Sequence, residues 1–492
     1  MKVYFDTPVP GFHKELADIL NLFFGSVQVA TELLASVDLK VVITETTGNR
    51  DRECHLTLSG RHQMALSAKG FVGEDALTDK RLRKRLHKTV LFDALVLATG
   101  KRLPWGSLTG IRPTRLVYEA MDRGLGLDAA LLEVSDTFRL SEEKTTLLRD
   151  IIKVQKGIKQ ASDHEVSCYI GIPFCRTRCR YCSFLSSEVG DGKLLPDYTN
   201  ALIKEIRGTA ALMKKRNLRA RSLYIGGGTP TTLSVEQLQS VMLAARPLIE
   251  QTSEVTVEAG RPDTITREKL AVIRDLGATR ISINPQTMFD RTLKMIGRDH
   301  TVGQVLESFH LARELGFDHI NMDLIAGLPG ETPGMFEQTI TQALALDPEA
   351  LTVHTLAVKR SSDMHRYSDP LPDATAVEQM VDFARSRAAL HGLQPYYLYR
   401  QKHMAGNLEN VGYAKPGFAC LYNIDMMEDR TTVLAMGAGA VSKLVDPNNR
   451  RILRSPNVKD IGHYLARVDE MLEKKDALFE GVGKGVRPPE ED

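Results

Sequence analysis

The sequence has 492 residues, so it is expected to fold into two or three domains rather than around one core. Its 64 lysines and arginines nearly balance its 62 aspartates and glutamates. Net charge therefore does not indicate a nucleic-acid or membrane-surface partner. An aspartate and two prolines interrupt the first ten residues, and no stretch approaches the ~20 apolar residues of a membrane span, so a cytoplasmic protein without such a span is predicted.

Residues 1–105 are expected to form a small α/β domain, because an apolar-periodic helix precedes strand-like runs and a long basic helix. The basic run at 80–88 is interpreted as a solvated helix face rather than a nucleic-acid site, since the rest of the chain is neutral. The first helix is expected over 12–24, the strands over 39–46, 54–59 and 63–68, and the apolar face of the second helix over 86–97.

Residues 106–165 are expected to form a helical linker, because they are mostly charged and helical in pattern. The only tryptophan, Trp105, lies next to this segment, with Arg112 and Arg115 nearby. These residues could contact an anionic substrate or dock the first domain onto the next, and docking is the favoured interpretation.

A regular alternation of strand-like and helical segments begins near residue 166 and continues to about residue 360. Ser234 and Thr301 each have a glutamine three residues later, and Thr332 precedes a proline, as at the start of helices. Six strand–helix units in succession predict parallel strands with helices outside, most simply a partial TIM-type (β/α)6 barrel. The strands are expected over 168–172, 222–225, 254–258, 280–283, 319–325 and 351–355.

Three neighbouring strands of this barrel carry polar residues on one alternating face. Fully buried parallel strands normally contain continuous apolar runs, and polar residues on solvent-facing edges are not expected where helices flank the strands. Unpaired carboxylates in a dry barrel would cost several kcal/mol, so we expect a centre filled by ligand or water. The residues concerned are Thr256, Glu258, Ser282, Asn284, Gln286, Asn321 and Asp323.

Residues 361–475 are expected to form an α-rich C-terminal extension that covers the substrate. This extension contains a tyrosine-rich stretch from residue 396 and a glycine-rich run from residue 436. Residues 476–492 are rich in Lys, Gly, Pro and Glu, which predicts a disordered tail.

Three of the six cysteines, Cys175, Cys179 and Cys182, fall in one short loop after the first barrel strand, where barrels carry their chemistry. A structural zinc site would need a fourth close cysteine or histidine, and the loop has none, so zinc and plain redox thiols are disfavoured. A [4Fe–4S] cluster on three thiolates keeps one iron open, which can chelate a small molecule. The thiolate charge is expected to be offset by three arginines of the loop, Arg176, Arg178 and Arg180.

The cysteine loop resembles that of the radical S-adenosylmethionine (SAM) superfamily, and the resemblance extends over residues 166–445. It is closest to the oxygen-independent coproporphyrinogen III oxidase group, in particular its HemZ-type branch. Well-known members have histidine at the position of Gly171 and often cysteine at that of Phe184. The matching stretches are Tyr169-Ile-Gly-Ile-Pro-Phe-Cys, Gly226-Gly-Gly-Thr-Pro, Val257-Glu-Ala-Gly, Ile283-Asn-Pro-Gln, Gly297-Arg-Asp-His and Asn321-Met-Asp-Leu-Ile-Ala-Gly-Leu-Pro-Gly.

This resemblance implies a [4Fe–4S] cluster on the three loop cysteines, with one or two SAM molecules beside it. It also implies that Tyr181 packs near SAM from the cysteine loop and that Ala357 is a small residue next to it. With two SAM molecules, one would be contacted by Tyr169, Gly227 and Glu258. The other would be contacted by Gly228, Thr229, Gln286, Arg298 and Asp323.

The implied reaction is oxidative decarboxylation of coproporphyrinogen III propionates to vinyl groups, giving protoporphyrinogen IX for haem biosynthesis. A flavodoxin- or ferredoxin-type protein would supply the electron that splits SAM into a 5′-deoxyadenosyl radical. The alternatives are a haem-binding chaperone of the same fold, or a radical methylase or ring-opening enzyme that acts on haem. The chaperones carry a His-Asn-x-x-Tyr-Trp motif, which the run from Cys420 lacks. The candidates for binding substrate carboxylates are Lys359, Arg360, Arg366, Arg400 and Lys402.

Overall fold

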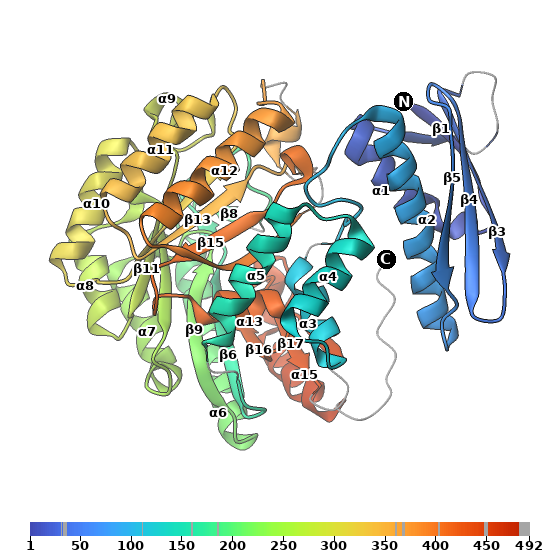
Figure 1. Ribbon diagram of the computed structural model, residues 1–492. Helices are drawn as coiled ribbons and strands as arrows, with labels where there is room; N and C mark the ends of the chain where they lie inside the picture. Colours follow the sequence, from blue (N-terminus) through green and yellow to red (C-terminus); the bar gives the residue numbers. More distant parts are fainter. Residues whose placement is uncertain are drawn as a thin grey trace. The chain divides into compact units, whose positions relative to one another are not determined.

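The chain divides into two compact units, Met1–Arg149 and Asp150–Asp492 (Figure 1). This division does not coincide with the predicted boundaries near residues 105 and 165. Helices α3 (Pro113–Asp122) and α4 (Leu127–Phe138), expected in a separate linker, belong to the first unit. The computed structural model describes residues 1–481 apart from 31, 33–36, 111, 159–160, 185, 360–361, 367–369, 402–403 and 447–450.

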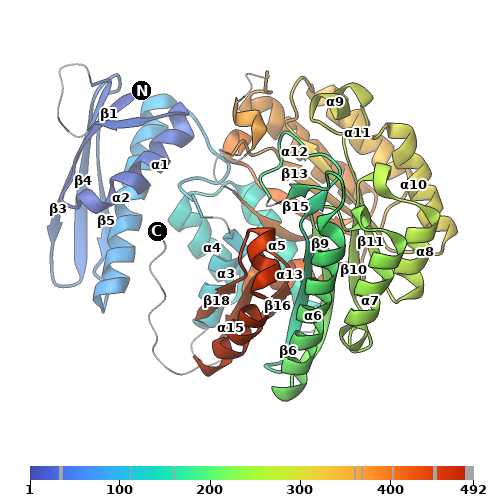
Figure 2. The same cartoon turned by 180° about the vertical axis from the view of Figure 1, so that it is seen from behind.

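The first unit contains a five-stranded sheet in the order β2-β1-β3-β4-β5, with two long helices packed on it (Figure 2). Its elements are β1 (Lys2–Asp6), α1 (His13–Phe24), β2 (Gln28–Ala30), β3 (Leu39–Thr47), β4 (Asp51–Gly60), β5 (Met64–Phe71) and α2 (Ala76–Thr99). The predicted first helix and the three predicted strands are confirmed. The short strands β1 and β2 were not predicted, and β1 pairs in parallel with both β2 and β3.

The basic run of α2 was predicted to be a solvated helix face, but part of it is half-buried and paired with acidic residues of the same unit. Arg83 and His87 both contact the carboxylate of Glu45 on β3, and the Lys84 ammonium lies 3.0 Å from a carboxylate oxygen of Glu15 on α1. These pairs hold α2 against its own sheet and its neighbouring helix, which supports a structural interpretation of the run.

Trp105 is fully buried, and its role in docking stays a prediction.

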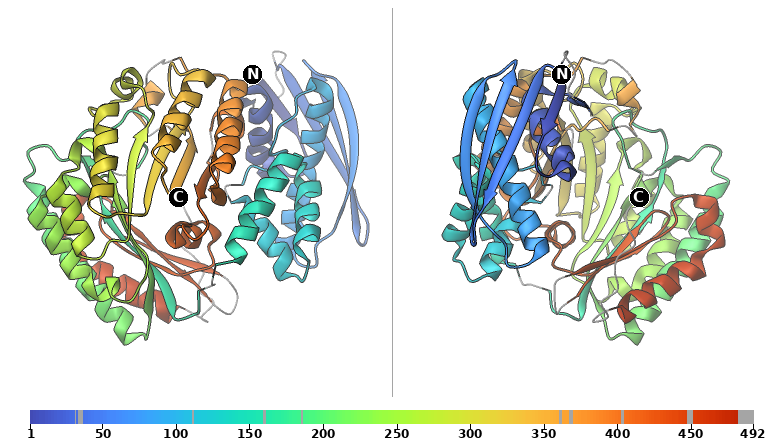
Figure 3. Two further views of the ribbon diagram at one scale, coloured as in Figure 1. Left: turned by 60° about the vertical axis from the view of Figure 1, so that its left-hand side comes forward. Right: turned by 90° about the vertical axis from the view of Figure 1, so that its right-hand side faces the viewer.

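The second unit is built on an eleven-stranded sheet whose centre is the predicted partial barrel (Figure 3). Six strands follow one another in the sheet in chain order and all run parallel. They are β6 (Glu165–Ile172), β9 (Arg219–Gly227), β10 (Val255–Gly260), β11 (Arg280–Gln286), β12 (Ile320–Ala326) and β13 (Ala350–Thr355). Helices α6 (Leu194–Lys215), α7 (Val235–Ile249), α8 (Arg267–Asp275), α10 (Val302–Glu314) and α11 (Pro333–Ala345) connect them on the outside.

The helix starts follow the predicted capping signals. Ser234 and Gln237 form a reciprocal capping box at the start of α7, and Thr301 and Gln304 repeat it at the start of α10. Thr332 caps α11, whose first residue is a proline. Each of these caps satisfies backbone N–H groups that would otherwise lack a partner at the helix start. The loops before these helices therefore end at defined positions.

The C-terminal part of the chain supplies strands as well as helices, and it belongs to the same compact unit as the barrel. One sheet edge is extended by β15 (Asn410–Ala414) and β14 (Gln394–Tyr399), which pair antiparallel beyond β13. The other edge is extended by β16 (Val433–Met436), β17 (Val441–Val445) and β18 (Ile452–Pro456), beginning with a parallel pairing of β16 to β6. The accompanying helices are α12 (Ala374–Leu390), α13 (Leu421–Glu428), α14 (Ile461–Ala466) and α15 (Val468–Glu480).

Helix α15 continues to Glu480, so the predicted tail at 476–492 begins as helix. Residues 482–492 lie outside the described residues. None of the helices in the described part of the chain has the length and apolar character needed to cross a bilayer.

A buried ion pair between Glu205 of α6 and Lys475 of α15 anchors the C-terminal helix, and both side chains are 0% exposed. The same carboxylate accepts hydrogen bonds from the Tyr464 hydroxyl at 2.5 Å, the Asn457 amide at 2.7 Å and the backbone N–H of Gly437 at 2.7 Å. Both oxygens of the Glu205 carboxylate therefore have partners, and such pairing offsets the cost of burying a charge.

Replacing Lys475 with methionine is expected to lower the free energy of unfolding by about 3–5 kcal/mol, because it leaves the Glu205 carboxylate buried without its counter-charge. Lys474 on the same helix is the matched control. It forms a 2.8 Å pair with Glu470, and both side chains are more than a third exposed. Its replacement by methionine should cost less than about 1 kcal/mol. Urea denaturation followed by circular dichroism measures both, and equal losses would contradict this account.

Candidate active site

A cavity of about 450 Å³ opens at the carboxyl ends of the barrel strands. The structure brings every residue predicted to bind the cluster or SAM to this one cavity, although the residues come from many separate elements. The predicted residues that line it are Cys175, Cys179, Cys182, Tyr169, Tyr181, Gly227, Gly228, Thr229, Glu258, Gln286, Arg298, Asp323 and Ala357. We call it the active-site cavity, and the roles of these residues stay predictions.

The three loop cysteines face the cavity as free thiols. Burial raises the pKa of the Cys175 and Cys182 thiols, and the hydroxyl of Thr229 donates to the Cys175 sulfur at 3.7 Å. Binding to a metal would lower these pKa values, because thiolates are the ligating form. The loop therefore holds its thiols in a partly enclosed place that suits a metal cluster better than free redox chemistry.

Two buried arginines from outside the loop surround Cys179. The Arg261 guanidinium donates to the Cys179 sulfur at 3.9 Å, and Arg298 lies on the same side. Burial alone would lower the pKa of Arg261, but Asp263 and the Cys179 sulfur raise it above its ordinary value. By contrast, Arg176 of the loop is 60% exposed and lies 3.8 Å from Asp263. Charge compensation at Cys179 thus comes from Arg261 and Arg298.

Arg261 was missed by the sequence analysis, which looked for the compensating charge inside the cysteine loop. It follows directly after β10, at the carboxyl end of a barrel strand. That position was the signal that could have identified it, because barrels place their functional residues at these strand ends.

The glycine run after β9 leaves no room for side chains. A Cβ atom on Gly228 would lie 2.5 Å from the carbonyl oxygen of Phe174 and 2.9 Å from the Cys175 sulfur. Gly227 has a φ of 118°, a conformation that favours glycine. The backbone of this run therefore passes directly against the cysteine loop, close enough to contact a group bound there.

Glu258 is a carboxylate of the cavity whose pKa is raised toward neutrality. Burial raises its pKa to about 7, although the Tyr224 hydroxyl donates to it at 2.5 Å and the Gly227 N–H at 3.2 Å. Asp323 differs. Burial alone would raise its pKa, but His354 and Asn321 lower it below the ordinary value. The cavity therefore contains one carboxylate that is ionised at neutral pH and one that is close to half protonated.

Gln286 and Arg298 form the next part of the wall. Gln286 has a φ of 69°, in the left-handed region that residues other than glycine rarely adopt, and it is buried. Such strain is found mostly at functional sites. The Arg298 guanidinium donates to the Tyr181 hydroxyl at 3.1 and 3.2 Å and to the carbonyl oxygen of Asn284 at 2.6 Å. Arg298 is thereby fixed in place before any ligand binds.

The part of the predicted polar face on β11 and β12 forms a hydrogen-bond network that extends to Thr352 on β13. The Asn321 amide donates to the Ser282 hydroxyl and to the Asp323 carboxylate, both at 2.8 Å. The Ser282 hydroxyl in turn donates to Asn284 at 2.6 Å, and the Thr352 hydroxyl donates to Asn321 at 3.1 Å. The network orients Asp323 toward the cavity, as expected for a polar barrel interior.

The C-terminal part of the chain forms the opposite side of the cavity, which we call the far wall. It consists of the end of β13 with residue 357, strands β14 and β15 with Gln401, helix α13, and the loop at 438–440. The sequence analysis assigned no site residue to this wall except Ala357. The missed residues with polar or large side chains are Thr352, His354, Thr355, Leu356, Tyr397, Tyr399, Gln401, Asn410, Asn423 and Met427.

Three aromatic rings stack beneath the cavity and join the barrel to the far wall. Tyr422 of α13 stacks on Tyr224 of β9, with ring centroids 4.6 Å apart, and on Tyr169 of β6 at 5.9 Å. Burial raises the pKa of all three tyrosines above the ordinary range, so their hydroxyls stay protonated. The stack closes the floor of the cavity with apolar area.

The predicted carboxylate-binding cations are not brought to the cavity. Arg400 is buried, and its guanidinium donates to the carbonyl oxygens of Asn407 and Leu408 at 2.8 and 3.4 Å. Lys359 is half-exposed and does not line the cavity. Arg360 and Lys402, and the side chain of Arg366, lie outside the described residues.

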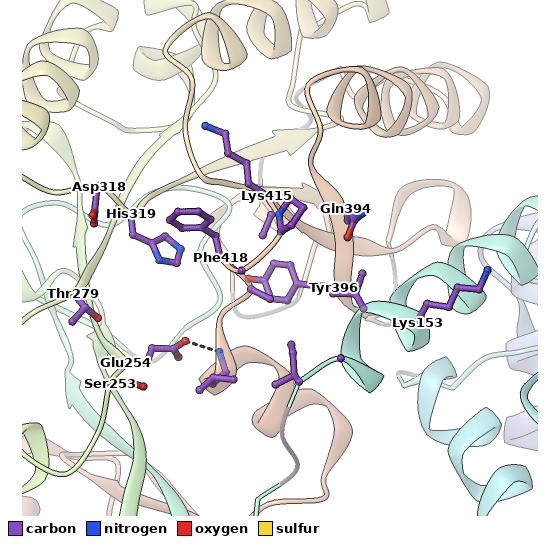
Figure 4. Close-up of a pocket in the computed structure, with 18 residues that line it drawn as sticks. Lys153, Ser253, Glu254, Thr279, Asp318, His319, Gln394, Tyr396, Lys415 and Phe418 are labelled. Atoms are coloured by element: carbon purple, nitrogen blue, oxygen red, sulfur yellow. Dashed lines mark hydrogen bonds between the residues drawn. The ribbon is translucent and has the colours of Figure 1, made fainter.

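A second cavity, of about 640 Å³, lies near the opposite ends of the strands and contains none of the loop cysteines (Figure 4). Its wall includes Glu254, whose carboxylate accepts from the backbone N–H groups of Leu421 and Tyr422 at 2.8 and 3.0 Å. These bonds cap the start of α13. Glu254 therefore has a structural role. It fixes the start of α13, the helix that contributes to the far wall of the active-site cavity.

The donor set of the active-site cavity fits a cluster better than a single ion. Three thiols from one short loop line the cavity, and thiolates are the ligands that hold iron–sulfur clusters. Glu258, Arg298 and Asp323 then provide acceptors and donors for a zwitterionic ligand such as SAM.

Comparisons with known proteins agree with this geometry. A family model described as the radical SAM superfamily matches residues 169–343. The oxygen-independent coproporphyrinogen-III oxidase-like protein HemZ of Bacillus subtilis is 37% identical, over 96% of this chain and 97% of that protein. The heme chaperone HemW of the same organism is 32% identical, over 62% of this chain and 76% of that protein.

Among solved structures, coproporphyrinogen III oxidase (HemN) from Escherichia coli, described as a radical SAM enzyme, aligns with a TM-score of 0.51. The alignment has 23% sequence identity and covers 65% of this chain and 72% of that chain. This likeness shows a shared fold, and together with the family model it confirms the predicted radical SAM fold.

Gly228→Ala is expected to weaken cluster binding roughly tenfold or more, because the added methyl group collides with the backbone of the cysteine loop. Gly303→Ala in α10 is the matched control, since its Cβ would meet only the Thr301 hydroxyl at an ordinary 3.7 Å. Iron and sulfide content after anaerobic reconstitution measures the effect. Full iron loading of Gly228→Ala would show that the glycine run does not abut the cluster.

Proposed function

The chain belongs to the radical SAM superfamily, in its oxygen-independent coproporphyrinogen oxidase-like group, and we propose that it converts propionate side chains of coproporphyrinogen III into vinyl groups. Membership implies a [4Fe–4S] cluster and SAM as cofactors. When bound, they supply a carbon-centred radical that removes a hydrogen atom from an unactivated carbon. Binding, orientation and exclusion of water are the tasks of the chain's own residues.

The observation that carries the proposal is that one cavity joins the proposed cofactor residues to the far wall. A site that bound only the cofactors would not need a second wall of tyrosine, asparagine and methionine side chains. Tyr399, Asn423 and Met427 offer apolar area and hydrogen-bond donors, which suits a ring system with polar substituents. The far wall therefore provides a place for a substrate beside the cofactors.

The substrate class is supported by the similarity to the HemZ protein, which extends over nearly the whole of both chains. That protein is described as oxygen-independent coproporphyrinogen-III oxidase-like. The similarity to the heme chaperone HemW covers only 62% of this chain. The relative that matches nearly the whole chain is thus the one described as oxidase-like, which favours a porphyrinogen substrate. Haem delivery is the alternative function, and the assay below tests it.

We assign the proposed SAM contacts to two sets of residues. Glu258, with Gly227 and Tyr169, would accept hydrogen bonds from one SAM molecule. The other set, Gln286, Arg298 and Asp323 with Gly228 and Thr229, would bind a second molecule or another part of the same one. Arg298 is suited to a carboxylate and Asp323 to an ammonium group, because each offers a fixed charge of the opposite sign. Ala357 would leave room beside them.

Anaerobically reconstituted protein with a reduced flavodoxin-type donor, SAM and coproporphyrinogen III is expected to release CO2 and form protoporphyrinogen IX. Cys179→Ser should lose this activity because it removes a proposed cluster ligand. Cys54→Ala, which changes a buried cysteine of the first unit, should keep it. Product chromatography and CO2 trapping measure the reaction. Stable haem binding with SAM cleavage but no vinyl product would favour the chaperone instead.

SAM affinity is expected to increase with pH around neutrality through Glu258. Burial raises the pKa of this residue to about 7, so its carboxylate becomes available as an acceptor only as the pH rises. Between about pH 6 and about pH 8 the ionised fraction of such a group rises roughly tenfold, and affinity should rise with it. Calorimetry with S-adenosylhomocysteine measures this change. Glu258→Gln should remove the rise, and an equal slope in both proteins would exclude Glu258 as its source.

A further inference from the structure

Charged side chains are unevenly distributed along the active-site cavity. Its arginines, Arg178, Arg261 and Arg298, lie at the cysteine end, where Arg261 and Arg298 are already engaged by protein oxygen atoms. The carboxylates of Glu258 and Asp323 also line the cavity, and they would repel a substrate that carries several carboxylates. Among the described residues of the far wall, His354 is the side chain that can carry a positive charge.

His354 lies at the boundary between the two halves of the cavity. Its Nε2 atom is 3.8 Å from a carboxylate oxygen of Asp323, which is beyond hydrogen-bonding distance. Its Nδ1 atom is 3.3 Å from the Tyr399 hydroxyl on β14. The side chain is 26% exposed, so it is accessible from the cavity. One nitrogen is therefore oriented by Tyr399, and the other keeps its capacity to donate to a ligand.

We propose that His354 binds a carboxylate of the substrate through its Nε2 atom, with the ring oriented by Tyr399. The inference rests on the proposed function, because it names how the same site recognises its tetracarboxylate substrate. Histidine is suited to this contact because its side chain can donate a hydrogen bond to a carboxylate and can carry positive charge. Nε2 is the atom that makes the contact, since it is not hydrogen-bonded to its neighbour Asp323.

A purely structural alternative makes different predictions. If His354 only positioned Asp323, its replacement would weaken SAM binding, because Asp323 is a proposed SAM contact. If His354 binds the substrate, its replacement weakens binding of carboxylate-bearing tetrapyrroles and leaves SAM binding unchanged. The two roles are separated by measuring both ligands on the same variant.

The probe is coproporphyrin III, the oxidised and fluorescent form of the proposed substrate, titrated into cluster-loaded protein under anaerobic conditions. His354→Gln is expected to weaken its binding roughly tenfold, because a hydrogen bond to a charged group is lost. Binding of the tetramethyl ester, which has no free carboxylates, should be equal in both proteins. His391→Gln, the same change at an exposed position after α12, is the matched control and should bind like the wild type.

These outcomes are decisive in either direction. Unchanged coproporphyrin III affinity in His354→Gln would overturn the inference, and so would an equal loss of S-adenosylhomocysteine affinity. Failure of the wild type to form a vinyl product would refute the proposed decarboxylation alone. The carboxylate-dependent binding is measured without turnover, so it tests His354 in that case too.

Discussion

The cost of burying polar side chains inside the half-barrel is the constraint on which the second unit depends. The interior holds a carboxylate, amides and hydroxyls where an ordinary parallel sheet would hold aliphatic residues, and each needs a partner. Asn321 meets this need by linking Ser282 to Asp323 across adjacent strands. Glu258 accepts hydrogen bonds from Tyr224 and Gly227, yet burial still raises its pKa to about 7. A cavity that admits a polar ligand follows from this balance.

The same constraint explains why the C-terminal segment belongs to the barrel. A half-barrel leaves its first and last strands, β6 and β13, with free edges, and free edges are normally covered. Strand β16 pairs with β6 and β15 with β13, so both edges are continued by the C-terminal chain. Helix α13 then brings Tyr422 under the cavity, and Glu254 fixes its start. The far wall of the site is therefore a consequence of completing the sheet.

The sequence predicted the barrel strands and the residues at their carboxyl ends, because both follow from local periodicity and from loop motifs. Glu258 and Asp323 share a face since side chains alternate along strands. The five added strands were missed because their pairing joins distant segments and leaves little local pattern. His354 could have been found, since it lies two residues after Thr352 and continues the polar face onto the sixth strand. Arg400 was a wrong candidate because its burial under the segment at 405–408 depends on tertiary contacts.

The distribution of charge along the cavity constrains how two ligands could share it. Arginines at Cys179 offset thiolate charge, the carboxylates of Glu258 and Asp323 attract a cation, and His354 is next to Asp323 on the side of the far wall. SAM carries a sulfonium and an ammonium group, so its positive charge is favoured near the carboxylates. A tetracarboxylate close to Glu258 and Asp323 would be repelled by their negative charges, and the positive charges of bound SAM would offset that repulsion. Bound SAM should therefore favour the approach of the proposed anionic substrate, and the substrate should not bind at the position of SAM.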